Sequence, residues 1–326
     1  MKADKVLTVI NDIINPMKLL ETKHGTAVSR LGFGAMQFGG TADEDSARDM
    51  FEACIGSGIN LFDTAVSYTG GESERILGAL LAPVADDVLI ATKAANDRPA
   101  SAANLRTSHA ESRKRLRVDA IDLYYLHRFD DETELEETFG TLAEMQSEGL
   151  IRHIGVSNFA AWQIMKAQAV CAKLGTQIDV CQPMYNLVKR QAEVEILPAC
   201  VDQDIAVCPF SPLGGGLLTG KYVDGAAGRL KDDRTYAARY GQAWMHETAR
   251  GLGALAESSS IPAIELAVAW VARHPAVTST LISARNVSQL QPSLNALNLE
   301  LSDDLFAQIT KLSPTPAPAT DRSEDT

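Results

Sequence analysis

Four ionisable side chains stand at, or just after, the ends of short apolar segments. Asp63, Lys93 and His127 each follow a run of mainly apolar residues, and Tyr68 lies in the stretch after Asp63. If these runs are parallel strands of one barrel, their carboxyl ends open onto a single mouth where functional residues gather. Alone, such residues are often helix caps, solvated charges or semi-buried polar groups. Their joint occurrence at consecutive strand ends predicts one functional site.

These four side chains have the chemistry of a proton-donating site. A tyrosine hydroxyl has a pKa of about 10, which is too high for ready proton exchange near neutral pH. An adjacent ammonium, that of Lys93, favours the phenolate of Tyr68 and lowers its pKa. Asp63 is expected to pair with Lys93 and hold it charged, and His127 to hydrogen-bond the substrate oxygen. Such a site suits reduction of a carbonyl to an alcohol, with a hydride supplied by a cofactor.

Composition narrows the class of protein. The 326 residues are 45% apolar and 22% charged, which is typical of a globular chain of one large or two small domains. The formal net charge of −12 disfavours nucleic acid as a partner, and we expect the basic run at 113–117 to be the solvated end of a helix. No apolar run is long enough to span a membrane, and residues 1–4 do not begin a secretory signal.

Cysteine usage indicates a reducing compartment. The chain has five cysteines, which is an odd number, and no CxxC pair. A disulfide framework or a zinc site is therefore not expected, and His153 and His246 lack the spacing of metal ligands. We expect a cytoplasmic protein without a metal ion. The sequence does not indicate its oligomeric state.

Eight short apolar runs predict the fold. The first seven are almost evenly spaced, and they begin near residues 31, 60, 88, 121, 151, 178 and 205, with the eighth near 278. Helix-compatible stretches lie between the runs, at 45–58 (capped by Thr41 or Asp43), 101–117, 134–149 and 160–174. Repeated strand–helix units in this number predict a (β/α)8 TIM barrel. A doubly wound sheet is the alternative, but the GxG at 32–34 is a weak signal for its glycine turn.

The segments outside the repeat predict the remaining organisation. A long polar loop at about 211–243 follows the seventh strand, and loops of this length are usually functional or mobile. Residues 17–30 predict a small N-terminal hairpin that closes the bottom of the barrel, with its turn at His24-Gly25. We therefore expect an extension of unknown role at 1–16, a single barrel domain at 17–312 and a flexible acidic tail at 313–326.

Over about residues 17–312 the sequence resembles the aldo-keto reductase superfamily. The matching motifs occur in order at the expected strand ends: DTA (63–65) with Tyr68, GESE (71–74), TK (92–93), DLYYLH (122–127), GVSNF (155–159), QPMYN (182–186), SPL (211–213) and GLLTGK (216–221). The resemblance implies a catalytic tetrad of Asp63, Tyr68, Lys93 and His127. It also implies an NADPH-dependent carbonyl reductase with Tyr68 as the general acid.

The resemblance further implies contacts with the nicotinamide end of the cofactor. Ser157, Asn158 and Gln182 match the side chains that hold the carboxamide, which needs both donors and acceptors. Phe210 matches an aromatic ring that lies against the nicotinamide. The full set of matching residues at this end is Gly34, Ala35, Met36, Asp63, Ser157, Asn158, Gln182 and Phe210.

Two other segments match the phosphate and adenosine contacts of the family. Glycine lets backbone N–H groups approach a pyrophosphate, and Lys221 adds positive charge. The loop over the pyrophosphate is matched by Ser211, Pro212, Leu213, Gly214, Gly216, Leu217 and Lys221. The adenosine segment is matched by Ser283, Arg285 and Gln289.

The choice of cofactor follows from two cations. Arg285 suits a 2′-phosphate because a guanidinium fork matches phosphate geometry, and Arg285 and Lys221 together favour NADPH over NADH. The sequence departs from the family at Ser283, where many relatives have glycine, and at Pro292-Ser293, where they have Glu-Asn. Two adenine contacts are therefore expected to be absent, and NADH stays open as an alternative.

Three functions remain open on the sequence. The first is NADPH-dependent reduction of an aldehyde or ketone, and the second is NAD(P)-dependent oxidation of a sugar or other alcohol by the same residues in reverse. The third is a cofactor-binding regulatory subunit, because the superfamily includes potassium-channel β-subunits, which this chain partly resembles. The substrate is expected to depend on the mouth loops at 37–43, 95–99 and 129–132 and on the long segment.

Overall fold

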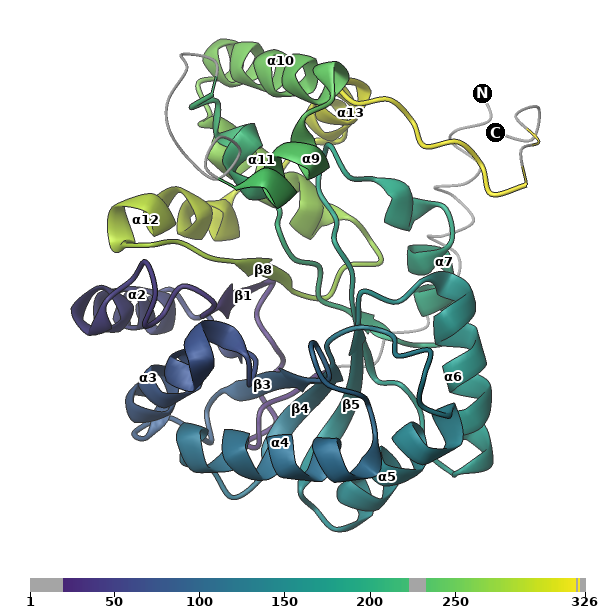
Figure 1. Cartoon of the computed structure of the whole chain (residues 1–326). Helices are drawn as coiled ribbons and strands as arrows, with labels where there is room; N and C mark the ends of the chain where they lie inside the picture. Colours follow the sequence, from purple (N-terminus) through teal and green to yellow (C-terminus); the bar gives the residue numbers. More distant parts are fainter. Residues whose placement is uncertain (1–19, 223–232, 321, 323–326) are drawn as a thin grey trace.

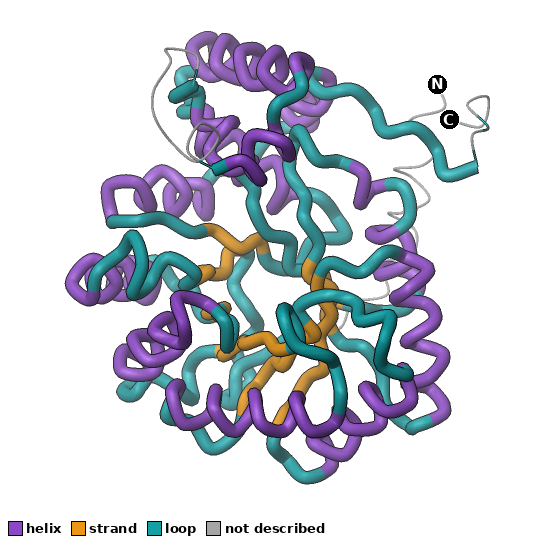
Figure 2. Tube along the Cα trace, in the orientation of Figure 1, coloured by secondary structure: helices purple, strands orange, loops and turns teal. Residues whose placement is uncertain are grey.

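The computed structural model describes residues 20–222, 233–320 and 322. Several predicted features lie outside the described residues: the extension at 1–16, residues 17–19 of the hairpin, residues 223–232 of the long segment, and residues 321 and 323–326 of the tail. In the described part, short strands lie at the centre and helices surround them (Figure 1, Figure 2).

Eight parallel strands form the curled sheet of a (β/α)8 barrel, which confirms the fold predicted from the spacing of the apolar runs. The strands are β1 (Leu31–Gly34), β2 (Leu61–Asp63), β3 (Leu89–Ala94), β4 (Ile121–Leu126), β5 (Ile151–Ser157), β6 (Val180–Gln182), β7 (Ala206–Val207) and β8 (Thr280–Ile282). Their order in the sheet is β7-β6-β5-β4-β3-β2-β1-β8. The sheet closes just beyond β7, where Phe210 bridges Leu281 and the Leu281 amide donates to Pro209 O at 2.9 Å.

The helices cover the outside of the barrel, and the four predicted from the sequence begin and end within about two residues of the expected positions. Asp43, not Thr41, caps the first of them, because its carboxylate accepts from Ser46 N at 2.9 Å. The helices are α2 (Glu44–Gly56), α3 (Glu72–Leu81), α4 (Ala102–Leu116), α5 (Leu135–Ser147), α6 (Ala161–Lys173), α7 (Ile196–Asp202), α9 (Arg234–Tyr240), α10 (Ala243–Ser259), α11 (Ala263–Arg273), α12 (Val287–Asn295) and α13 (Asp303–Lys311). Within the described residues, no single helix has both the length and the apolar character needed to cross a bilayer.

The alternation of side chains along the strands places the ionisable residues. Successive side chains of a strand point to opposite faces. A buried cluster inside the barrel includes Leu61 on β2, Ala91 on β3 and Tyr125 on β4. Two positions further along the chain, and on the same face, each is followed by an ionisable residue: Asp63, Lys93 and His127.

A short hairpin closes the amino-terminal end of the barrel, as predicted. Glu21 and Ala27 form an antiparallel bridge, and Val28 N donates to Leu20 O at 2.8 Å. Leu20 is buried in the same inner cluster as the strand residues. Gly25 supplies the left-handed turn, with a φ of 76°. These contacts confirm the hairpin over residues 20–28.

The segment after β7 is partly helical, which its polar composition did not predict. It contains the 3₁₀ turn η3 (Gly214–Thr219) and then α9, which begins at a cap where Asp233 accepts from Thr235 N at 2.8 Å. Tyr240 of α9 is fully buried, so this helix is packed onto the barrel and is not a free loop. The expectation of a loop over the whole of 211–243 is corrected accordingly.

Candidate active site

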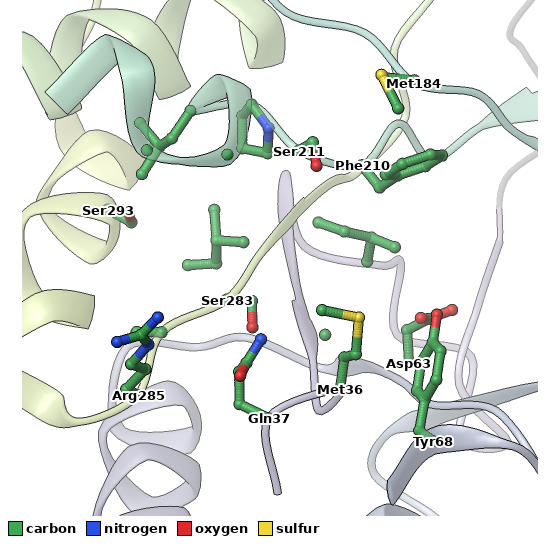
Figure 3. A pocket seen from close by; sticks show the side chains of 18 of the residues that line it. Met36, Gln37, Asp63, Tyr68, Met184, Phe210, Ser211, Ser283, Arg285 and Ser293 are labelled. Carbon is green, nitrogen blue, oxygen red and sulfur yellow. The ribbon is translucent and has the colours of Figure 1, made fainter. Parts of the chain in front are cut away.

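The structure brings the four strand-end residues together at the carboxyl end of the barrel. Lys93 Nζ is paired with the Asp63 carboxylate and donates to Thr64 O at 2.8 Å. The same Nζ lies 5.1 Å from the ring centroid of Tyr68, and the ring centroids of Tyr68 and His127 are 5.6 Å apart. Figure 3 shows Tyr68 and Asp63 side by side at one end of a pocket. The convergence expected from the sequence is present.

Burial and charge act in opposite directions on Lys93 and Tyr68. Burial by itself lowers the pKa of the Lys93 ammonium, but Asp63 and Tyr68 outweigh it and the pKa is raised. For Tyr68, burial is the largest effect and raises the pKa of the hydroxyl, while Lys93 offsets only part of the rise. The sequence-based expectation of a lowered tyrosine pKa is therefore wrong. The hydroxyl of Tyr68 stays protonated and Lys93 stays charged near neutral pH.

His127 is a neutral imidazole in this site. Burial, followed by the charges of Lys93 and Arg128, lowers the pKa of His127 to about 3. Its Nδ1 atom is buried and has no hydrogen-bond partner within the described residues. Its backbone is fixed by Asn158, whose Nδ2 donates to His127 O at 2.9 Å. A neutral imidazole beside Tyr68 can donate one hydrogen bond to an oxygen in the cavity.

A cavity of about 1100 Å³ extends from this group of residues to the far side of the barrel mouth. It exceeds the roughly 300–1000 Å³ of ordinary small-molecule pockets. Tyr68 and Asp63 lie at one end, and Arg285 and Ser293 lie at the other (Figure 3). The sequence-predicted residues that line it are Gly34, Met36, Asp63, Tyr68, His127, Ser157, Asn158, Gln182, Phe210, Ser211, Pro212, Leu213, Gly216, Lys221, Ser283, Arg285 and Gln289.

Four predicted residues lie behind the cavity wall: Lys93, Ala35, Gly214 and Leu217. Lys93 still reaches the site through Asp63 and Tyr68. The small or apolar side chains of Ala35 and Leu217 are buried in the core, and the Gly214 amide donates a hydrogen bond to Ser211 O at 3.0 Å. These three residues do not line the cavity in the described structure, and their contact with a cofactor stays a prediction.

The three polar residues assigned to a carboxamide are bonded into the site. Gln182 Nε2 donates to Asp63 Oδ2 at 2.9 Å, and Ser157 Oγ donates to Gln182 O at 3.0 Å. Asn158 has a φ of 57°, a left-handed conformation that is uncommon outside glycine and often marks a functional site. These bonds connect β5 and β6 to the carboxylate that holds Lys93.

Three basic side chains on the cavity wall have no acidic partner within the described residues. Lys221, Arg239 and Arg285 line the cavity, and none forms an ion pair with an acidic side chain of the described residues. This arrangement is notable in a chain whose net charge is −12. Gly216, with a φ of 93°, lies under Lys221, since an added Cβ would be 3.2 Å from Lys221 Nζ. The wall therefore suits an anionic ligand next to a glycine turn.

Sequence reasoning missed other lining residues that only the fold assembles. Gln37, Asn96 and Asp97 belong to loops that the sequence marked as the mouth, but no role was assigned to them. Arg239 lies on α9, a helix that the polar composition of its segment did not predict. The remaining unassigned lining residues are Ser67, Thr69, Met184, Gly215, Thr219, Tyr236, Ile264, Leu281, Ile282, Ala284, Ser288, Pro292 and Ser293.

Comparison with known proteins finds relatives of nearly the whole chain. A model of the Aldo/keto reductase family matches residues 30–314. The chain is 32% identical to the uncharacterized oxidoreductase YrpG of Bacillus subtilis (strain 168), over 90% of this chain and 94% of that protein. It is 33% identical to the aldo-keto reductase YhdN of the same strain, over 82% and 84% of the two chains. It is also 31% identical to a probable voltage-gated potassium channel subunit beta of Arabidopsis thaliana, over 85% and 90%. The chain therefore belongs to the aldo/keto reductase family and is an oxidoreductase.

Proposed function

We propose that the protein is an NADPH-dependent reductase that converts an aldehyde or ketone into an alcohol, with Tyr68 as the general acid. The observation that carries this proposal is the grouping of Tyr68, the Lys93–Asp63 pair and His127 at one end of a long cavity. Membership of an oxidoreductase family supports it. The substrate is a small carbonyl compound.

The cavity residues fit a dinucleotide with an extra phosphate. Gly215 has a φ of 64°, and an added Cβ would lie 2.7 Å from the Tyr236 ring, so the turn runs closely beneath α9. Lys221 beside this turn would hold the pyrophosphate, and Arg285 at the far end would hold a 2′-phosphate. Phe210, at the end nearer Tyr68, would lie against the nicotinamide ring (Figure 3).

Tyr68, Lys93, Asp63 and His127 then each have one role in the reduction. NADPH, when bound, supplies the hydride to the carbonyl carbon. His127 donates a hydrogen bond to the carbonyl oxygen and orients it. Tyr68, kept protonated by burial, transfers its hydroxyl proton to that oxygen as negative charge develops there. Lys93, held by Asp63, stabilises the resulting phenolate.

A matched pair of variants tests this proposal. Tyr68→Phe and Tyr236→Phe each remove one hydroxyl from the cavity, but it is Tyr68 that adjoins Lys93. We expect Tyr68→Phe to lower kcat about 10²-fold or more, because the proton donor is lost. NADPH affinity, measured by fluorescence titration, should stay unchanged in both variants. Near-normal NADPH oxidation by Tyr68→Phe across a panel of aldehydes and ketones would refute the assignment.

The reverse reaction and a binding role are the other candidates. Oxidation of a sugar or other alcohol needs the phenolate of Tyr68, and because burial raises that pKa, this rate should increase as the pH rises. The similarity to a probable potassium channel subunit beta of Arabidopsis thaliana favours a regulatory subunit as the second candidate. Tight cofactor retention, negligible turnover with every carbonyl and a tetrameric mass would favour that role.

We also propose a cytoplasmic location and the domain limits given by the sequence. All five cysteines are free and buried in the described structure, which fits a reducing compartment. The continuous match of the family model to residues 30–314 supports a single domain that ends near 312, and the proposed start at 17 adds the hairpin that precedes the match.

A further inference from the structure

The segment that carries Tyr68 has a strained backbone. It follows β2 and forms the 3₁₀ turn η1 (Tyr68–Gly71), in which Thr69 and Gly70 have φ values of 49° and 67°. A threonine in the left-handed region costs free energy, because its branched side chain crowds the backbone. Surrounding contacts must therefore hold this turn, and with it the hydroxyl of Tyr68.

On one side, hydroxyl groups bind the turn to the loop after β1. Thr69 Oγ1 donates to Phe38 O at 2.8 Å and accepts from Ser73 N at 2.9 Å. Ser73 Oγ donates to Ala35 O at 2.8 Å and lies 2.7 Å from Thr64 Oγ1. These contacts fix the turn against one wall of the cavity.

On the other side, Arg115 of α4 binds the turn. The sequence predicted that its basic run is the solvated end of a helix, and this is wrong for Arg115. Its Nη1 donates to Val66 O at 3.1 Å and to Glu74 Oε2 at 3.2 Å, and its Nη2 lies 3.6 Å from Glu111. The guanidinium lies against Gly71, where an added Cβ would be 2.5 Å from Cζ. This contact is available because α3 and α4 lie side by side (Figure 1).

Glu74 connects this contact to the strand that carries Lys93. Its carboxylate is fully buried on α3 and accepts a hydrogen bond from Thr92 Oγ1 at 2.7 Å. Thr92 immediately precedes Lys93 on β3. The Arg115–Glu74 ion pair therefore connects two segments of the site. One is Val66, in the segment leading to Tyr68, and the other is Thr92, next to Lys93 on β3.

We propose that Arg115 and Glu74 are positioning residues that set the distance between the Tyr68 hydroxyl and the Lys93 ammonium. This inference rests on the proposed function, in which these two groups donate a proton and stabilise the phenolate. Neither Arg115 nor Glu74 lines the cavity in the described structure. They act through Val66 O and Thr92 Oγ1, and not by touching substrate or cofactor.

Loss of the Arg115 guanidinium should displace Tyr68 and leave the cofactor-binding part of the cavity unchanged. Removal of Arg115 frees the turn on one side and leaves the hydroxyl contacts of Thr69 and Ser73 on the other. A displacement of about 1 Å at reacting groups can lower a rate about 10²-fold. We therefore expect Arg115→Ala to lower kcat about 10- to 100-fold, with the Kd for NADPH unchanged. Because proton transfer becomes slower, the solvent deuterium isotope effect on kcat should increase.

The experiment compares Arg115→Ala with Lys114→Ala in the full chain. Lys114 is the next cation on the same helix and is exposed, so this variant removes an equal charge without touching the turn. The measurements are kcat, the solvent isotope effect, the Kd for NADPH and the Tm. The Arg115 side chain is 31% exposed, so millimolar methylguanidinium can enter the gap and should restore kcat in Arg115→Ala. Lys114→Ala should behave as the unmodified protein does.

Two results would overturn the inference. One is an unchanged kcat and isotope effect in Arg115→Ala together with a lower Tm, since Arg115 would then only support packing. The other is a weakened affinity for NADPH in proportion to the loss of kcat, which would indicate a disturbed cavity. If Arg115→Ala does not fold, Arg115→Lys, which keeps the charge but not the planar fork, is judged by the same two results. Tyr68→Phe in the same assay separates the proposals, because normal turnover there refutes the general acid whatever Arg115 does.

Discussion

At one end of the cavity, charged and polar side chains are buried and bind one another, whereas at the other end they are exposed and face the open space. Lys93 is 1% exposed and paired with Asp63, and Gln182 binds the second oxygen of that carboxylate. Arg285, at the other end, is exposed and has no acidic partner within the described residues, and the same holds for Lys221 on the cavity wall beside Gly216. The two ends lie on opposite sides of the same cavity (Figure 3).

The difference shows that the two ends of the cavity suit two different tasks, proton transfer and the binding of an anionic ligand. The end at Tyr68 comes from strands and from a turn that is bonded on both sides, so its groups are fixed before any ligand arrives, as proton transfer requires. The end at Arg285 comes from the loop after β8 and the start of α12, where the solvated guanidinium of Arg285 can turn toward a phosphate. We infer that the first end determines rate and the second determines affinity and the choice of cofactor.

The largest expected effect is on stability, from Lys93→Met. This variant leaves the carboxylate of Asp63 buried without its cation, and breaking a buried pair from one side costs about 3–5 kcal/mol. The free energy of unfolding, measured in urea, should fall by about that amount. Lys221→Met, which removes an exposed cation of the cavity wall, is the matched control and should change the free energy of unfolding by less than about 0.5 kcal/mol. Equal losses of unfolding free energy in the two variants would show that the buried pair at Tyr68 and the exposed cation do not differ in their contribution to stability.

A smaller effect is expected on cofactor affinity, from Arg285→Ala. A hydrogen bond to a charged group contributes about 1.5–3 kcal/mol, and exposure favours the lower value, so the Kd for NADPH should rise about tenfold. The Kd for NADH should not change, because NADH lacks the 2′-phosphate. Lys221→Ala is the control that should weaken both cofactors alike. Unchanged selectivity in Arg285→Ala would assign the phosphate to another residue.

The end at Tyr68 was the more predictable of the two. A period of two along β2, β3 and β4 determines which residues share the inner face, so Asp63, Lys93 and His127 follow from the pattern alone. The direction of the Tyr68 pKa did not follow, because it depends on how deeply the ring is buried, and sequence does not give that depth. Opposing effects of burial and of Lys93 can be ranked only with the structure.

The residues that sequence missed depend on which helix lies against which. Arg115 turns inward because α4 packs beside α3, and its guanidinium meets Glu74 of α3 and Gly71 at the end of η1. Its basic run has the composition of an exposed helix end, so nothing local signals the contact. Arg239 reaches the cavity from α9, whose cap at Asp233 is the one local sign of a helix in a polar stretch.

At neutral pH the smallest effect is expected from His127, because its contribution to stability changes only in acid. Its pKa is about 3 in the folded protein, against about 6.5 in an unfolded chain, so between these values the unfolded chain binds the proton and the folded one does not. Stability is therefore lost as the pH falls from about 6.5 toward 3, by at most about 1.4 kcal/mol per pH unit from this group. His127→Gln should flatten part of the fall in Tm over this range, with His24→Gln at the exposed turn as the control substitution.

Burial also lowers the pKa of His109 and His274, so a remaining fall is expected. An unaltered slope in His127→Gln would show that His127 can take up a proton without cost, and the end at Tyr68 would then be as solvated as the end at Arg285.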